Sequence, residues 1–264
     1  ASQADRLVEV GEALLAGGID IIEVTFTVPR AMRVLEAMAE KIGDRILLGA
    51  GTILDSETAR VAIFSGIASG TSSITGFLQA EDCINTLRAL EALGVETFID
   101  ADGELQVTGT GGRFYEPAFP LDLGNSGTEI RLMAGLLAGQ PFQAELTGDK
   151  SLVTRPMGRI CVPLEMMGAS FEFLGEDQHA PLRLQGGSLT SLDYRMPVAS
   201  AQVKSCLLIA ALFADGESVI HEPRRTRDHT ENLLRVIDGL TPEERLEWAG
   251  GAGDDELLFP VMCR

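Results

Sequence analysis

Apolar residues alternate between helix and strand patterns over about the first 60 residues of the chain. Residues 4–16 carry apolar side chains at helical spacing. Residues 19–26 and 45–54 are the short, nearly continuous apolar runs that are typical of strands buried on both faces. Two more helices are expected, one over residues 29–42 and one beginning near Asp55. This alternation predicts a parallel α/β unit.

After about residue 65 the pattern changes, and a long internal repeat begins. Each copy has two apolar-faced helices joined by short β-type segments, and equivalent helices lie about 75 residues apart. A third copy starts with RDHTENLLRVID at residues 227–238, and the tail at residues 239–264 does not continue it. Within that tail, TPEERLEW predicts one more helix from its capping residue and its proline. The repeated helices are 82–96 with 157–172, and 125–140 with 200–216.

The acidic balance of the chain limits its partners. The formal net charge is −18, and such a field repels nucleic acid and anionic membranes, so we expect neither as a partner. The longest apolar run, residues 206–214, is too short to span a bilayer, and the first residues carry no targeting signal. The cysteines lie far apart, with Cys161 and Cys206 in apolar runs. This indicates buried reduced thiols, no metal site and a cytoplasmic location.

Two polar turns stand at equivalent points of the repeat, each at the expected start of a helix. The first is GNSGT, with Asn125, Ser126, Gly127 and Thr128. Backbone N–H groups at such a start favour an anion, whereas the simpler alternative is ordinary helix capping. The second turn is ASAQVKS, and its polar residues are Ser200, Gln202, Lys204 and Ser205.

Two arginine-containing segments offer cations for such an anion. TRPMGR supplies Arg155 and Arg159, whose planar guanidinium groups suit carboxylate or phosphate, and a surface ion pair is the alternative. RRTRDHTE is a basic cluster in which Thr226 or Asp228 caps a helix, and a solvated loop is the alternative. Separately, Glu23 lies inside a buried-strand pattern, where burial would raise the pKa of its carboxyl toward that of a general acid or base.

Residues of about 64–237 resemble the EPSP synthase (3-phosphoshikimate 1-carboxyvinyltransferase) family. The resemblance implies transfer of the enolpyruvyl group of phosphoenolpyruvate to the 5-hydroxyl of shikimate 3-phosphate, with release of phosphate and without a metal or other cofactor. It also implies a prism-like domain of βαβαββ repeats. The strings that carry it are GFLQAEDCINTLRALEALGVE, LDLGNSGTEIRL, LTGDKSLVTRPMGR, PVASAQVKSCLLIAALFADG and RDHTENLL.

The same resemblance assigns roles to residues of both turns. Gly127 and Arg155 would contact phosphoenolpyruvate, and Gln202 would lie between the two substrates. Arg155 and Gln202 are the candidate catalytic residues. The remaining candidate substrate-binding residues are Ser200 on the shikimate phosphate, Asn125 lining the pocket, Thr226 in place of the usual Ser, and Arg60.

Two departures from the family pattern predict that this chain alone is incomplete or inactive. Asp55 stands where the family has an essential Lys, in a segment where only Ser56, Thr58 and Arg60 fit the pattern. The third repeat breaks off after Asp238, and the family's acid–base Asp and Glu belong to a second domain that does not follow.

Residues of about 4–63 resemble a different family, the start of the 2-keto-3-deoxy-6-phosphogluconate aldolase barrel. The strings EALLAGGIDIIEVTFTVPRAM and LLGAGTILDSETARVAI carry this resemblance, and Glu23 would be the catalytic Glu if the chain were aldolase-like. Thr27 replaces an expected Arg, the Schiff-base Lys strand does not follow, and Arg60 fits the patterns of both families.

The chain is therefore expected to be a chimera of the α/β class, α+β in type. The predicted domains are a partial (β/α) barrel-like segment at 1–63, an EPSP synthase-like prism domain at 64–238 and an unassigned tail at 239–264. Small phosphorylated substrates are the expected partners, together with self-association through exposed strand edges. The alternatives are a non-catalytic phosphosugar-binding fragment and a 2-keto-3-deoxy-6-phosphogluconate-type aldolase.

Overall fold

The computed structural model describes most of the chain, which divides into two compact units, Ala1–Ser56 and Glu57–Arg264. The described residues are 3–19, 21–25, 38, 41–42, 45, 47–51, 55–74, 77–101, 103–236 and 257–263.

The first unit contains the predicted first helix and the two predicted strands. Helix α1 (Gln3–Ala16) is followed by β1 (Ile21–Thr25) and β2 (Leu47–Gly51), which pair in parallel with Glu23 opposite Gly49. The parallel pairing confirms the α/β pattern, and the described strands form no closed barrel. Most of the helix expected over 29–42 lies outside the described residues, as does the helix expected at TPEERLEW.

The second unit is built on a repeated helix–strand pair. Helix α5 (Glu129–Ala138) leads into β7 (Gln143–Thr147), and α7 (Ala201–Ala211) leads into β12 (Ala214–Glu222). Helix α3 (Asp55–Ile67) leads into β3 (Ser69–Ile74) in the same way. The structural repeat therefore begins one helix before the first repeated segment that was recognised in the sequence, residues 82–96. The remaining helices, which open the three copies, are α4 (Glu81–Ala92), α6 (Gly158–Met167) and α8 (His229–Val236).

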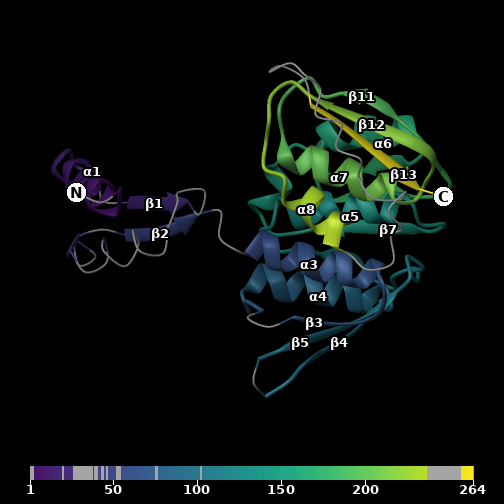
Figure 1. The fold of residues 1–264 in the computed structure, drawn as a ribbon, viewed down its shortest axis with the longest axis horizontal. Helices are drawn as coiled ribbons and strands as arrows, with labels where there is room; N and C mark the ends of the chain where they lie inside the picture. Colours follow the sequence, from purple (N-terminus) through teal and green to yellow (C-terminus); the bar gives the residue numbers. More distant parts are fainter. Residues whose placement is uncertain are drawn as a thin grey trace. The chain divides into compact units, whose positions relative to one another are not determined.

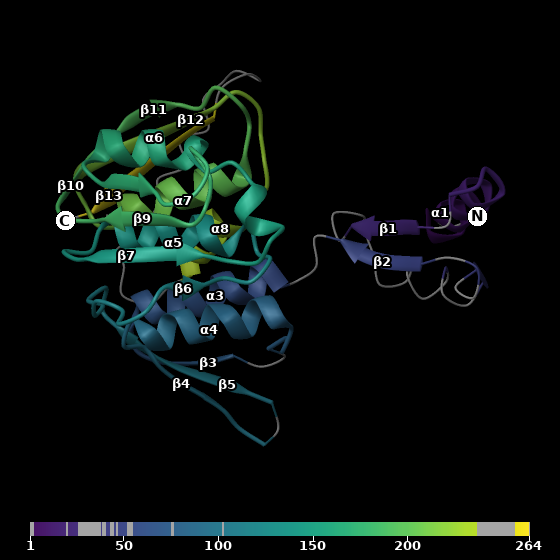
Figure 2. The same ribbon diagram turned by 180° about the vertical axis from the view of Figure 1, so that it is seen from behind.

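Three sheets surround these helices in the described part of the second unit. Their strand orders are β3-β5-β4, β6-β7-β9-β8 and β10-β12-β11, with β13 also paired to β12. In Figures 1 and 2, α3 and α4 lie along one face of the first sheet. The strands not yet located are β4 (Glu96–Ile99), β5 (Leu105–Thr110), β6 (Leu121–Asp122), β8 (Ser170–Phe173), β9 (Leu182–Gln185), β10 (Leu189–Thr190), β11 (Asp193–Arg195) and β13 (Leu257–Cys263).

Each sheet joins two successive copies of the repeat by the same antiparallel pairing. The strand after the repeated helix pairs with the second strand of the next copy, as β3 does with β5 and β7 does with β9. Strand β13 takes this place beside β12, with a register from Gly216 opposite Cys263 to Glu222 opposite Leu257. Part of the tail that could not be assigned from the sequence is thus the strand that the third copy requires.

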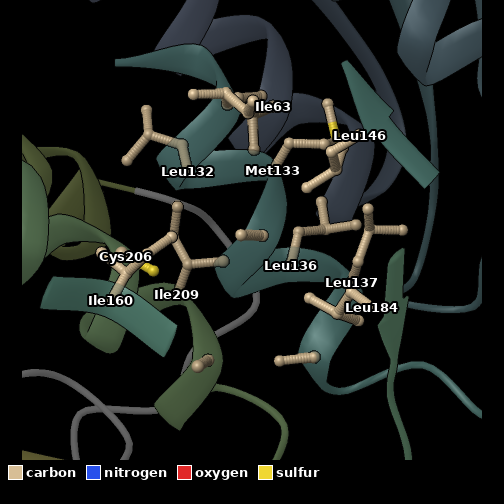
Figure 3. Packing of buried hydrophobic residues seen from close by; sticks show 14 of the residues in the cluster. Ile63, Leu132, Met133, Leu136, Leu137, Leu146, Ile160, Leu184, Cys206 and Ile209 are labelled. Carbon is tan, nitrogen blue, oxygen red and sulfur yellow. The ribbon is translucent and has the colours of Figure 1, made fainter. Parts of the chain in front are cut away.

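The core of the second unit is the contact between α5 and α7. Figure 3 shows Leu132 of α5 in one buried cluster with Cys206 and Ile209 of α7, whereas Met133 lies beside Ile63 and Leu146. A Cβ on Gly135 would lie 2.3 Å from the carbonyl oxygen of Cys206, so only glycine allows the two backbones to approach this closely. Leu146 of β7 and Leu184 of β9, two strands of one sheet, also belong to the cluster.

The thiols behave as small core residues, as the sequence predicts. Cys83, Cys161 and Cys206 are buried and free of disulfides in the described structure. Burial is the main cause that raises the pKa of Cys161 to about 12 and raises that of Cys206 further. Both thiols therefore stay protonated and unreactive at neutral pH. Separately, none of the helices described has the length and apolar character needed to cross a membrane.

Replacement of Gly135 by Ala is expected to lower the free energy of unfolding by about 1–2 kcal/mol, even though Ala favours helices over Gly. The added methyl would push α5 away from the Cys206 carbonyl, which belongs to a backbone and cannot move alone. Chemical denaturation measures the loss. Gly187→Ala is the matched control, because a Cβ there meets nothing within 4 Å. Equal stability of the two variants would contradict the role of close packing.

A chain shortened after residue 256 is expected to expose the edge of β12. Hydrogen exchange of the amides in residues 216–222 should become at least about tenfold faster, whereas those of β7 keep their partner β9 and their protection. Light scattering should also show association through the open edge. Unchanged exchange in β12 would show that β13 does not stabilise this sheet.

Candidate functional site

Two helix starts from successive copies of the repeat meet at one end of the α5–α7 contact. Gln202 Nε2 donates to Thr128 Oγ1 at 3.0 Å, which joins the start of α7 to the start of α5. Both side chains are half-buried. The two polar turns noticed in the sequence are therefore brought together in space, with their N–H groups at the positive ends of two helix dipoles.

Ordinary capping is also present at both starts. Ser200 is the N-cap of α7, and its Oγ accepts a hydrogen bond from the Val203 N–H at 3.4 Å. Ser126 Oγ accepts from the Glu129 N–H at 3.3 Å. A capping hydroxyl accepts a hydrogen bond through its oxygen, so its own hydrogen remains available to donate to a ligand. Capping and ligand binding are thus compatible at Ser200.

Arg155 lies directly against the first turn. Its Nη2 donates to Asn125 Oδ1 at 2.6 Å. A Cβ on Gly127 would lie 2.7 Å from Arg155 Nη1, so the absence of a side chain at residue 127 lets the guanidinium reach the turn. Arg155 is half-buried and Asn125 is exposed, which leaves the pair open to a ligand.

Arg131 is a member of the site that the sequence motifs did not reveal. Its Nη1 donates to the Gly127 carbonyl, and its Nη2 donates to the Pro156 carbonyl at 2.9 Å. It therefore ties the turn at Gly127 to the segment that carries Arg155. One available signal was its position in the first turn of α5, where a cation opposes the helix dipole.

The three guanidinium groups near this turn form a local positive site in an acidic protein. Burial is the main cause that lowers the pKa of Arg131, and repulsion from Arg155 and Arg159 lowers it further. Arg159 is exposed, so it can follow a ligand. Like charges held together near helix N-termini produce a positive potential that favours a carboxylate or phosphate.

The segment around Thr226 is linked to α7 through Glu222. Thr226 Oγ1 donates to Glu222 Oε1, and Glu222 Oε2 lies 3.0 Å from Lys204 Nζ. Lys204 Nζ also lies 2.6 Å from Glu231 Oε1 in the first turn of α8. The contacts of Lys204, Glu222 and Glu231 could not be predicted from the sequence, because the three residues lie on three different elements and follow no local spacing pattern.

The other candidate residues lie on separate elements. Arg60 is buried on α3, at 5% exposure, and its part in substrate binding stays a prediction. Glu23 lies in β1, within the first compact unit. The described residues contain no group of three or more His, Cys, Asp or Glu side chains arranged to hold a metal ion.

Comparisons with known proteins match the chain to two families. The profile of EPSP synthase (3-phosphoshikimate 1-carboxyvinyltransferase) matches residues 54–241, and that of KDPG and KHG aldolase matches residues 1–74.

Curated relatives of the longer segment are named 3-phosphoshikimate 1-carboxyvinyltransferase. The protein of Methylococcus capsulatus is 53% identical over 177 residues, which cover 66% of this chain and 40% of the relative. That of Listeria monocytogenes is 46% identical over 205 residues, which cover 74% of this chain and 48% of the relative. The chain thus spans less than half the length of these relatives.

A solved structure supports the same relation. The EPSP synthase of Acinetobacter baumannii superimposes with a TM-score of 0.68 at 40% identity, over 77% of this chain and 44% of that protein. The resemblance seen in the motifs is confirmed over most of the chain, and so is the mixed α/β fold. Through residues 54–241 the chain belongs to the EPSP synthase family.

Proposed function

We propose that residues 54–241 form half of the substrate site of an enolpyruvyl transferase of the EPSP synthase type. The substrates would be phosphoenolpyruvate and shikimate 3-phosphate. This proposal rests on one cluster of contacts. Asn125 accepts a hydrogen bond from Arg155, and Arg131 donates to the Gly127 carbonyl. The hydrogen bond between Gln202 and Thr128 lies beside them. These contacts support an anion site at the place where the family motifs fall.

In this proposal Arg155 and the backbone N–H groups near Gly127 bind phosphoenolpyruvate. Gln202 lies between the substrates, and Ser200 donates its hydroxyl hydrogen to the phosphate of shikimate 3-phosphate. The chemical role of the half-site is to hold anionic charge in a fixed array of donors, which lowers the cost of charge development in the reaction. No metal or other cofactor takes part.

We further propose that this chain alone binds these ligands in the cytoplasm without turning them over. Asp55 occupies the position of a family Lys, and less than half the length of the relatives is present. Each tenfold loss of rate corresponds to about 1.4 kcal/mol of barrier, so the loss of several cations and proton-transfer groups removes many powers of ten.

The aldolase alternative finds less support in the described residues. Glu23 is present, but the chain has only three lysines, Lys41, Lys150 and Lys204. Lys41 pairs with Glu12, and Lys204 pairs with Glu222 and Glu231. Borohydride trapping with pyruvate should therefore give no covalent adduct.

Calorimetry is expected to detect binding of shikimate 3-phosphate and of phosphoenolpyruvate at millimolar affinity or better, with phosphoenolpyruvate binding lost in Arg155→Ala. A coupled phosphate assay with both substrates should read zero for the chain alone and rise when a complementing second domain is added to the Asp55→Lys variant. The absence of heat from the parent chain would contradict the proposed site. Absence of phosphate release in the mixture would contradict the proposed chemistry.

Gly127→Ala is expected to keep the fold and weaken phosphoenolpyruvate binding about tenfold, or 1.4 kcal/mol. The added methyl meets the ends of Arg155 and Arg131, which are flexible and can move, but their guanidinium groups then leave the anion site. Thermal unfolding checks the fold, and ligand titration measures the affinity, with Gly187→Ala as the control. Unchanged affinity would place the ligand elsewhere.

A further inference from the structure

Three buried charged side chains from three elements meet behind the start of α7. Lys204 of α7, Glu222 at the end of β12 and Glu231 of α8 are each at most 1% exposed. Lys204 Nζ lies 3.0 Å from Glu222 and 2.6 Å from Glu231. Buried charges are costly to remove from water, and replacing one member leaves the others uncompensated.

The cluster reaches the candidate phosphate site through Thr226. The Thr226 hydroxyl donates to Glu222 Oε1, and its backbone N–H donates to Glu222 Oε2 at 3.5 Å. A hydroxyl has one hydrogen to donate, so Thr226 cannot hold Glu222 and donate to a phosphate at the same time. Ser200 differs, because its Oγ accepts from Val203 and its hydrogen is not used by the cap.

We propose that Glu222 and Lys204 form a latch for Thr226, with Lys204 as a positioning residue for the phosphate of shikimate 3-phosphate. The latch rests on the proposed function. Without ligand, Glu222 holds the Thr226 hydroxyl. When the phosphate binds, Thr226 turns its hydrogen to the phosphate, and Glu222 keeps Lys204 as its partner. Lys204 thus keeps the buried carboxylate of Glu222 paired with a positive charge after Thr226 has turned away. The same positive charge offsets the repulsion between the Glu222 carboxylate and the incoming phosphate.

A second contact fixes the surroundings of the latch. Thr230 Oγ1 of α8 donates to Ser205 Oγ of α7 at 2.7 Å, and both side chains are buried. Helix α8 therefore stays attached to α7 whether or not Thr226 is held. Only the segment between Glu222 and α8, whose residues 223–228 are half-buried or exposed, has to adjust.

The latch predicts opposite effects for two substitutions within the cluster, measured as the Kd of shikimate 3-phosphate by calorimetry. Lys204→Met should weaken binding at least about tenfold, because Glu222 then keeps Thr226 as its remaining neutralising contact. Glu222→Gln removes the carboxylate that competes for the Thr226 hydroxyl, so binding should stay equal or tighten up to about threefold. A merely structural cluster predicts that both substitutions weaken binding.

Three further variants and one ligand-free measurement complete the test. Lys41→Met removes an exposed lysine from its pair with Glu12 and should change nothing, whereas Lys204→Arg keeps the charge and should bind within about threefold of the parent. Thr226→Val should weaken binding and abolish the further effect of Lys204→Met in the double variant. Thermal unfolding checks each fold, and Glu222→Gln decides the question if Lys204→Met does not fold.

Hydrogen exchange of the Thr226 amide, without ligand, separates the latch from the proposed function. It should be faster in Glu222→Gln than in the parent chain. Equal weakening by Glu222→Gln and Lys204→Met, or additive effects in the double variant, would overturn the latch. A parent chain that gives no heat contradicts the proposed function instead. In that case, unchanged exchange at Thr226 in Glu222→Gln overturns the latch as well.

Discussion

The close contact between α5 and α7 is the constraint on which the candidate site depends. Gly135 allows the backbones to approach, and buried side chains of both helices fill the remaining space. Because the helices are fixed side by side, their N-terminal turns are fixed too, and Gln202 reaches Thr128. The packing of two repeated helices thereby supplies two adjacent sets of N–H donors, which a single helix could not provide.

The electrostatics of the site are local and do not follow the net charge. The chain carries a formal charge of −18, yet Arg131, Arg155 and Arg159 lie near one turn. Arg131 has two protein carbonyls as acceptors, so its guanidinium acts on the framework, whereas Arg155 keeps only Asn125 as its described side-chain partner. Arg155, which the motif had indicated, is therefore more available to a ligand than Arg131, and Arg131 supports the turn beside it.

Much of the fold and about half of the site followed from the sequence, for physical reasons. Helix periodicity and the repeat spacing located α4 to α8, because apolar faces must be buried whatever their partners are. The turns at Asn125 and Ser200 were visible because capping residues have local preferences. Arg131, Glu222 and Glu231 were not, since their roles come from contacts between elements that no local pattern records. The division at Ser56–Glu57 also depends on packing, because α3 belongs to the repeat of the second unit.

Strand β13 shows why the tail could be placed only in three dimensions. A strand pairs through its backbone, so the place beside β12 demands an extended segment at a suitable distance along the chain and tolerates many sequences. Residues 257–263 meet that demand without matching the family profile, which ends at residue 241. Because the pairing runs to Glu222, the same strand reaches the residue that holds Thr226. A segment outside the recognised family thus connects to the candidate phosphate site through one shared sheet.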